Sequence, residues 1–172
     1  YKAADFDPDV NEALIQVMGF ESGDELISHW KDIEAGKLPL PAGHTTCTTI
    51  FDPSQAPPNL HVGRWETAAP YELTEGSWDD VKEKYADRCV EVWMQYTSNL
   101  EKGKVINRYA YSPLDIERKL IDMVRGSFKQ GAYIPTQMGY FRPNDLCSQY
   151  RTPIKGLYIC GASVYPGGMI LA

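Results

Sequence analysis

The sequence predicts a mixed fold, in which an α+β region is followed by the strand–turn–helix unit of an α/β domain. Two observations predict the α+β region: apolar residues recur at three- and four-residue steps over residues 77–96, and β-branched residues cluster over 45–51. The third observation is the wholly apolar run 156–162, which leads into a glycine-rich turn at 166–168. A buried parallel strand followed by such a turn and a helix start is typical of α/β folds.

The first elements expected are two short amphipathic helices. Residues 7–19 begin with Asp7 followed by proline, a helix-start pattern, and then carry apolar residues at helical spacing. Residues 22–36 begin with a capping box formed by Ser22 and Glu25 and end at a glycine.

Strands are expected next, because residues 45–51 and 61–69 are rich in β-branched and apolar side chains and are separated by proline turns. We expect the two to form a hairpin-like pair with a long loop. The periodic segment 77–96 predicts a long helix with one broad apolar face. Residues 104–111 predict a further strand.

A last helix is expected to start at Ser112, where a cap, a first-turn proline and the early acid Asp115 follow one another. Residues 125–149 lack periodicity and are rich in glycine, proline and aromatic side chains. We therefore expect irregular chain there, and we place the boundary between two domains, 1–149 and 150–172, where it gives way to the last strand.

Composition excludes several classes of function. The net charge of -6 and the scattered basic residues argue against nucleic-acid binding, which needs clustered Lys and Arg. The four cysteines are widely spaced and form no CxxC, so we expect no metal site and a reducing compartment. We expect a cytoplasmic protein, with peripheral association with a membrane left open.

The C-terminal strand and turn carry the sharpest chemical signal. Such a turn brings backbone N–H groups and a helix dipole to a cofactor, and glycines let the ligand approach the backbone. Taken alone, the motif fits a ligand-free strand–turn–helix equally well, and that alternative stays open.

Several segments, in order along the chain, carry a family resemblance. They are Trp30–Gly36, Asp52–Pro58 with His61 and Val62, Ala69–Tyr71, Ser112–Glu117, Arg142–Pro143, Tyr150–Ser163 and Pro166–Gly168. In these segments the sequence resembles the phytoene desaturase, or phytoene dehydrogenase-like, family of FAD-dependent oxidoreductases, within the amine-oxidase-like flavoprotein group. The resemblance covers nearly the whole chain, and its C-terminal end is the most specific part.

The resemblance implies a two-domain flavoenzyme whose Rossmann-like FAD-binding domain is built from both ends of a longer chain. Residues 1–149 would be the C-terminal part of an inserted substrate-binding domain of mixed or antiparallel sheet with helices. Residues 150–172 would be the last strand–turn–helix piece of the FAD-binding domain. The residues it implies at the cofactor are Gly161, Ala162, Ser163, Pro166, Gly167, Gly168 and Met169. The side chains that would wall the substrate site are Tyr133, Tyr140, Phe141, Tyr165 and Gln130.

The sequence departs from the family pattern in three places. It has no GxGxxG turn, so half of the FAD site would come from polypeptide outside this chain. Met169 stands where relatives usually have a small residue, and Gln130 stands where they often carry a histidine. An amide exchanges no proton near neutral pH, so we assign no catalytic residue.

We therefore expect the C-terminal fragment of an FAD-dependent oxidoreductase, of dehydrogenase or desaturase type, acting on a hydrophobic small molecule. Its partner would be the remaining N-terminal FAD-binding part of the same enzyme, and self-association is left open. The alternative is a non-catalytic binding module or a structural subunit. Arg142 and Arg151 have two interpretations: each clamps a carboxylate or phosphate, or each forms a salt bridge at the domain junction.

Overall fold

A computed structural model describes residues 13–97 and 100–168 of the chain, which divides into two compact units between Ala110 and Tyr111. This division into compact units does not test the predicted domain boundary between residues 149 and 150, which stays a prediction.

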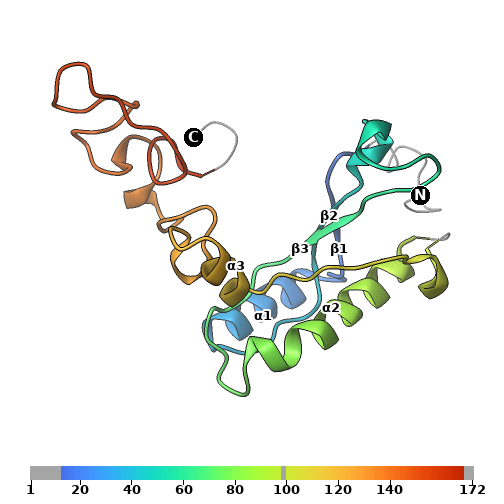
Figure 1. Cartoon of the computed structure of the whole chain (residues 1–172). Helices are drawn as coiled ribbons and strands as arrows, with labels where there is room; N and C mark the ends of the chain where they lie inside the picture. The colour runs from blue at the N-terminus through green and yellow to red at the C-terminus, as the bar shows by residue number, and fades with distance from the viewer. Residues whose placement is uncertain (1–12, 98–99, 169–172) are drawn as a thin grey trace. The chain divides into compact units, whose positions relative to one another are not determined.

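Unit 1 contains a three-stranded antiparallel sheet in the order β1 (Gln16–Met18), β2 (Gly43–Thr46) and β3 (Arg64–Glu66). Val17 lies opposite His44, and Thr45 lies opposite Trp65. Figure 1 shows the three strands side by side. The expected segments 45–51 and 61–69 pair only in part, through β2 and β3. The first strand ends at Thr46, because Thr48–Ile50 form a 3-10 turn, and the second is limited to Arg64–Glu66.

The expectation of a helix over residues 7–19 is wrong for the described residues 13–19, none of which is helical, and β1 occupies Gln16–Met18. The expected start at Asp7 lies outside the described residues. The apolar spacing fits a helix, but β2 offers backbone partners to Gln16–Met18, and tertiary pairing overrides local preference in so short a segment. The strand expected over 104–111 is also wrong, since no regular strand is present there.

Two helices follow the sequence-based expectations closely. In α1 (Gly23–Glu34), the Ser22 hydroxyl accepts a hydrogen bond from the Glu25 N–H at 3.2 Å, so the N-cap is confirmed. In α2 (Trp78–Gln95), the buried residues Trp78, Tyr85, Cys89 and Trp93 recur at the predicted helical spacing.

The core of unit 1 lies between α2 and the strands. The Trp93 ring packs beside that of Trp65, with ring centroids 6.0 Å apart. A Cβ atom at Gly63 would lie 2.5 Å from the Trp93 ring, so only glycine lets the chain pass so close to it. The indole of Trp78 donates to the Pro70 carbonyl at 3.0 Å, which satisfies its buried N–H group.

Unit 2 begins with α3 (Pro113–Lys119), whose predicted start is confirmed. The Ser112 hydroxyl accepts from the Asp115 N–H at 3.1 Å, and the Asp115 carboxylate accepts from the Ser112 N–H at 3.0 Å. The rest of the unit is irregular, as expected for 125–149, with short 3-10 turns at Val124–Gly126, Pro135–Gln137 and Gly139–Phe141.

The C-terminal strand expected over 156–162 is replaced, in the structure of this chain, by a single antiparallel bridge between Arg151 and Tyr158. The Ile159 N–H also donates to the Tyr150 carbonyl at 3.0 Å. A parallel strand requires parallel neighbours on which to form its hydrogen bonds, and the described residues of unit 2 include no parallel strand. The Rossmann-like piece therefore stays a prediction.

The two units differ in how much apolar surface they bury. Unit 1 buries Met18, Ala42, Cys47, Trp78, Tyr85, Cys89 and Trp93. In the described part of unit 2, Val164 is the one large apolar side chain that is fully buried. Over the described residues, no helix combines the length and apolarity needed to cross a membrane.

Candidate functional site

The candidate site lies in unit 2, where residues 126–142 meet the C-terminal turn 161–168. The Gly139 N–H donates to the Pro166 carbonyl at 2.9 Å, and the Tyr133 hydroxyl donates to the Gly168 carbonyl at 2.5 Å. These contacts join segments that lie about thirty residues apart in the sequence. The structure therefore brings residues predicted for the substrate next to residues predicted for the cofactor.

Arg142 is the buried centre of this region, and only 3% of its surface is exposed. Its guanidinium donates to the carbonyls of Lys129, at 3.4 Å, and Gln130, and it lies 3.8 Å from the Met138 sulfur. Its Cζ lies 5.8 Å from the centre of the Tyr133 ring, within the range of a cation–π contact. Arg142 thus holds the segment 126–142 in its bent path.

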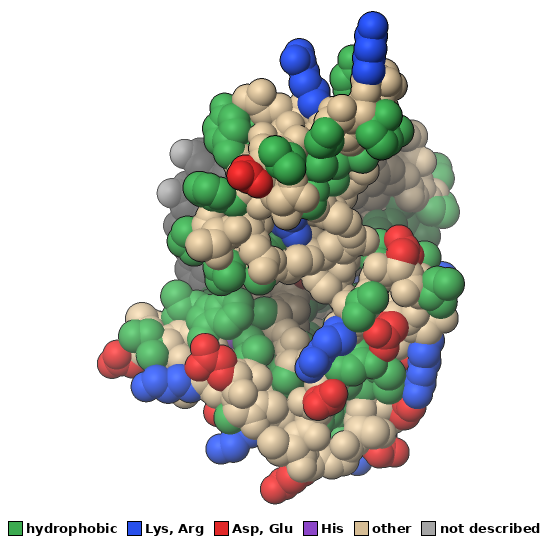
Figure 2. All heavy atoms as spheres, turned by 90° about the vertical axis from the view of Figure 1, so that its left-hand side faces the viewer, with side chains coloured by type: hydrophobic (Ala, Val, Ile, Leu, Met, Phe, Trp, Pro, Cys, Tyr) green, Lys and Arg blue, Asp and Glu red, His purple; other side chains and the backbone are tan. Residues whose placement is uncertain are grey.

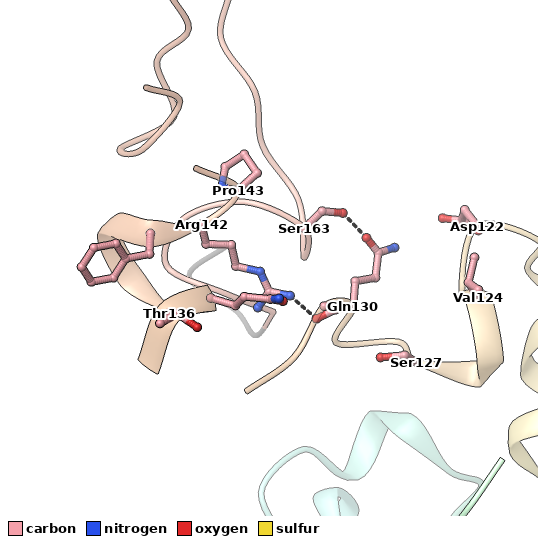
Figure 3. A pocket seen from close by; sticks show the side chains of 11 residues that line it. Asp122, Val124, Ser127, Gln130, Thr136, Arg142, Pro143 and Ser163 are labelled. Atoms are coloured by element: carbon pink, nitrogen blue, oxygen red, sulfur yellow. Dashed lines mark hydrogen bonds between the residues drawn. The ribbon is translucent and has the colours of Figure 1, made fainter. Parts of the chain in front are cut away.

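Gln130 links the two segments directly. Its φ of 49° lies in the left-handed region, which is unusual for a residue other than glycine. This conformation directs its carbonyl to Arg142, while its side-chain Oε1 accepts a hydrogen bond from the Ser163 hydroxyl. Figure 3 shows Gln130 meeting Ser163 through its side chain and Arg142 through its backbone carbonyl.

A cavity of about 620 Å³ opens beside these side chains. It is lined mainly by polar groups. The lining residues are Asp122, Val124, Ser127, Gln130, Gly131, Thr136, Gln137, Phe141, Arg142, Pro143 and Ser163.

Three of the residues expected at the site line this cavity: Gln130 and Phe141, expected at the substrate, and Ser163, expected at the cofactor. Tyr140 and Tyr165 lie together elsewhere in unit 2, with ring centroids 5.3 Å apart. Their proximity raises the pKa of the Tyr165 hydroxyl, with burial as a smaller cause.

Of the other expected residues, Tyr133 contacts Gly168 from outside the cavity lining, and Met169 lies outside the described residues. Gly161, Ala162, Pro166 and Gly167 belong to the C-terminal turn but do not line the cavity. Sequence reasoning missed Ser127, Thr136 and Gln137, which the structure places in the lining. Polar residues in an aperiodic loop gave no signal that would have singled them out.

The glycines of the turn differ in why a glycine is found there: some positions leave no room for a side chain, and one has open space beside it. A Cβ atom at Gly168 would lie 2.5 Å from the Lys129 carbonyl oxygen, and one at Gly167 would lie 2.8 Å from the Arg142 Nη1. Packing within the chain therefore accounts for both of these glycines. At Gly161, whose φ is +117°, a Cβ atom would meet nothing within 4 Å. Bare backbone open to a ligand is thus found at Gly161.

Unit 2 exposes many large apolar side chains for its size. They include Ile121 at 87%, Leu146 at 73%, Tyr158 at 70%, Ile154 at 63% and Phe141 at 60% exposure. Figure 2 shows one face of the molecule, on which hydrophobic side chains are interspersed with backbone, polar and charged groups. Apolar side chains exposed in this way are available for contact with a ligand or another polypeptide.

No family model matches the chain. The chain is 47% identical over 174 residues to a subunit of limonene dehydrogenase from Castellaniella defragrans, and this match covers 99% of this chain and 32% of that protein. It is 34% identical over 124 residues to pyridine nucleotide-disulfide oxidoreductase domain-containing protein 2 of Rattus norvegicus and of Mus musculus. That match covers 70% of this chain and 21% of each of those proteins.

The chain spans about a third or less of the length of these curated relatives. Over most or nearly all of its own length, it is therefore similar to a portion of longer proteins that are named as a dehydrogenase subunit and as oxidoreductase-domain proteins.

Proposed function

We propose that the chain forms part of an FAD-dependent dehydrogenase of the phytoene dehydrogenase-like group, acting on a hydrophobic small molecule. The observation that carries this proposal is the 47% identity to the limonene dehydrogenase subunit over nearly the whole chain. The weaker similarity to pyridine nucleotide-disulfide oxidoreductase domain-containing protein 2 supports the same general class.

A hydrophobic substrate agrees with the substrate for which the Castellaniella defragrans relative is named, because limonene is a hydrocarbon. The aromatic residues Tyr133, Tyr140, Phe141 and Tyr165 supply apolar surface near the C-terminal turn, and between 50% and 60% of Tyr133, Tyr140 and Phe141 is exposed. Such surface suits a wall against which an apolar molecule is positioned and from which water is excluded.

The residues proposed to hold FAD fit that role unequally. Gly161 presents open backbone, and Ser163 presents an exposed hydroxyl at the cavity, so both fit a group that approaches from outside this chain. Gly168 packs against Lys129 and fits a supporting role for the turn instead. When bound, the flavin supplies the acceptor for a hydride from the substrate. This chain contributes the positioning and the exclusion of water.

We also propose that the exposed apolar surface of unit 2 is covered by the polypeptide that supplies the rest of the FAD-binding domain. The relatives are about three times as long as the matched region or longer, so their remaining length is ample for such a domain. The limonene dehydrogenase relative is itself named as a subunit, which agrees with a partner polypeptide in the complete enzyme.

We also propose a cytoplasmic location, because the spacing of the four cysteines is the one expected in a reducing environment.

The proposal is tested by purifying the complete enzyme that contains this chain and recording its flavin absorption spectrum. We expect a bound flavin and oxidation of limonene with an artificial electron acceptor. The informative pair of variants is Gly161→Ala and Gly156→Ala. Both glycines have a positive φ, and an added Cβ atom would meet nothing within 4 Å at either position.

The two variants therefore impose backbone strain without a steric clash, and they differ in their expected distance from the cofactor. Gly161→Ala should lower the flavin content, and Gly156→Ala should leave it unchanged. Absence of flavin from a folded, complete enzyme would refute the proposal and favour a non-catalytic binding module or structural subunit.

A further inference from the structure

The charge of Arg142 lacks a carboxylate partner among the described residues. A guanidinium group stays protonated at any physiological pH, and a charge taken out of water costs several kcal/mol unless it is compensated. Arg142 is 3% exposed, yet its oxygen partners are the neutral carbonyls of Lys129 and Gln130. Over residues 13–97 and 100–168, the ion pairs of the structure all involve other residues.

The side chains around Arg142 offer hydrogen-bond donors to the cavity. The Oε1 atom of Gln130 accepts from Ser163, and the Oε1 atom of Gln137 accepts from the Ala132 N–H at 3.0 Å. With their oxygens engaged, both side chains have their amide N–H groups left as donors toward other partners. Ser127 and Thr136, which each carry a hydroxyl group, line the same cavity.

We propose that Arg142 is the charged centre of an oxyanion-binding site in this cavity, which takes a phosphate or carboxylate group of a ligand. A planar guanidinium binds both groups with paired hydrogen bonds, and the surrounding hydroxyls and amides complete the set of donors. The site is independent of the proposed flavin chemistry, since it rests on the burial of Arg142 and on the polar lining alone.

Asp122 also lines the cavity and opposes an anion there. Figure 3 shows it across the cavity from Arg142. Its negative charge allows a second test of the site. Asp122→Asn should strengthen anion binding while leaving the packing of Arg142 intact. If Arg142 had only a structural role, Asp122→Asn would not change the affinity of the chain for anions.

The test titrates the ¹⁵N-labelled chain with inorganic phosphate and, separately, with acetate, at ionic strength held constant with chloride. The Nε–H resonances of the arginine side chains report binding. We expect a saturable shift of the Arg142 resonance and none of Arg151, an exposed arginine in the same unit. Arg142→Gln should weaken binding at least about tenfold, and Arg151→Gln should not.

Saturation by phosphate alone, by acetate alone or by both supports the proposal and identifies the source of the oxyanion. A linear response, or equal responses of Arg142 and Arg151, would overturn it. If Arg142→Gln does not fold, Arg142→Lys keeps the charge without the planar fork and should bind with intermediate affinity. The resonance shift in the unaltered chain shows whether Arg142 binds an oxyanion, without the need for a variant. This result is independent of whether the complete enzyme holds flavin.

Discussion

Substituting Gly168 by alanine tests whether the C-terminal turn is held by packing within the chain. An added Cβ atom would lie 2.5 Å from the Lys129 carbonyl oxygen and 2.7 Å from the Lys129 Cα. Ordinary contacts of a Cβ atom begin at 3.4 Å. The neighbours are backbone atoms and cannot rotate away, so the turn has to move off the segment 126–142.

Overpacking of this kind costs about 1–3 kcal/mol. Because each 1.4 kcal/mol is a factor of ten, the contact between the two segments should open roughly 5- to 150-fold more often. The Gly139 N–H reports this opening, since it donates to the Pro166 carbonyl at 2.9 Å across the contact.

Amide hydrogen exchange at Gly139 measures the effect. We expect exchange in Gly168→Ala to be faster by that factor, and exchange in Gly156→Ala to be unchanged, because Gly156 has no atom within 4 Å of its added Cβ. Unchanged exchange at Gly139 in the Gly168 variant would refute the view that packing fixes this glycine.

Three further predictions concern two buried side chains, His29 and Cys89, and one helix-capping side chain, Ser112. Burial lowers the pKa of His29 below its usual 6.5, so the unfolded state binds the proton more readily. The free energy of unfolding should therefore fall as pH falls through about 6.5, as followed by tryptophan fluorescence in urea. Burial raises the pKa of Cys89 to about 12, so a thiol reagent should modify the exposed Cys160 at least about tenfold faster. Ser112→Ala should cost about 1 kcal/mol and speed exchange of the Asp115 amide, which the hydroxyl caps.

Each of these predictions has a matched control. His29→Gln should flatten the pH dependence, and an unchanged slope would contradict the assignment to His29. Urea should bring Cys89 to the same reaction rate as Cys160, and rapid reaction of Cys89 in the native chain would argue against its burial. Ser112→Thr should retain the cap, so equal losses in the alanine and threonine variants would show that the hydroxyl has no capping role.

The helices of the chain could be predicted from the sequence because their signals are local. The helix caps at Ser22 and Ser112 and the apolar spacing of 77–96 each involve residues within a few positions of one another, and the structure forms all three helices. The strands were harder to predict. Gln16–Met18 adopts a strand because β2 is available to pair with it, and nothing within residues 7–19 carries that information.

The composition of the candidate site could be predicted only in part. The glycine-rich C-terminal turn, the aromatic residues near it and the family resemblance that suggests a flavin could all be recognised before the fold was known. Three features depend on the folded arrangement: Gln130 bonds to Ser163, Arg142 is buried without a carboxylate partner among the described residues, and Gly168 packs so closely on Lys129 that no side chain fits. The difference arises because local hydrogen bonding and periodicity are encoded by near neighbours, whereas burial and close approach depend on which distant segments the folded chain brings into contact.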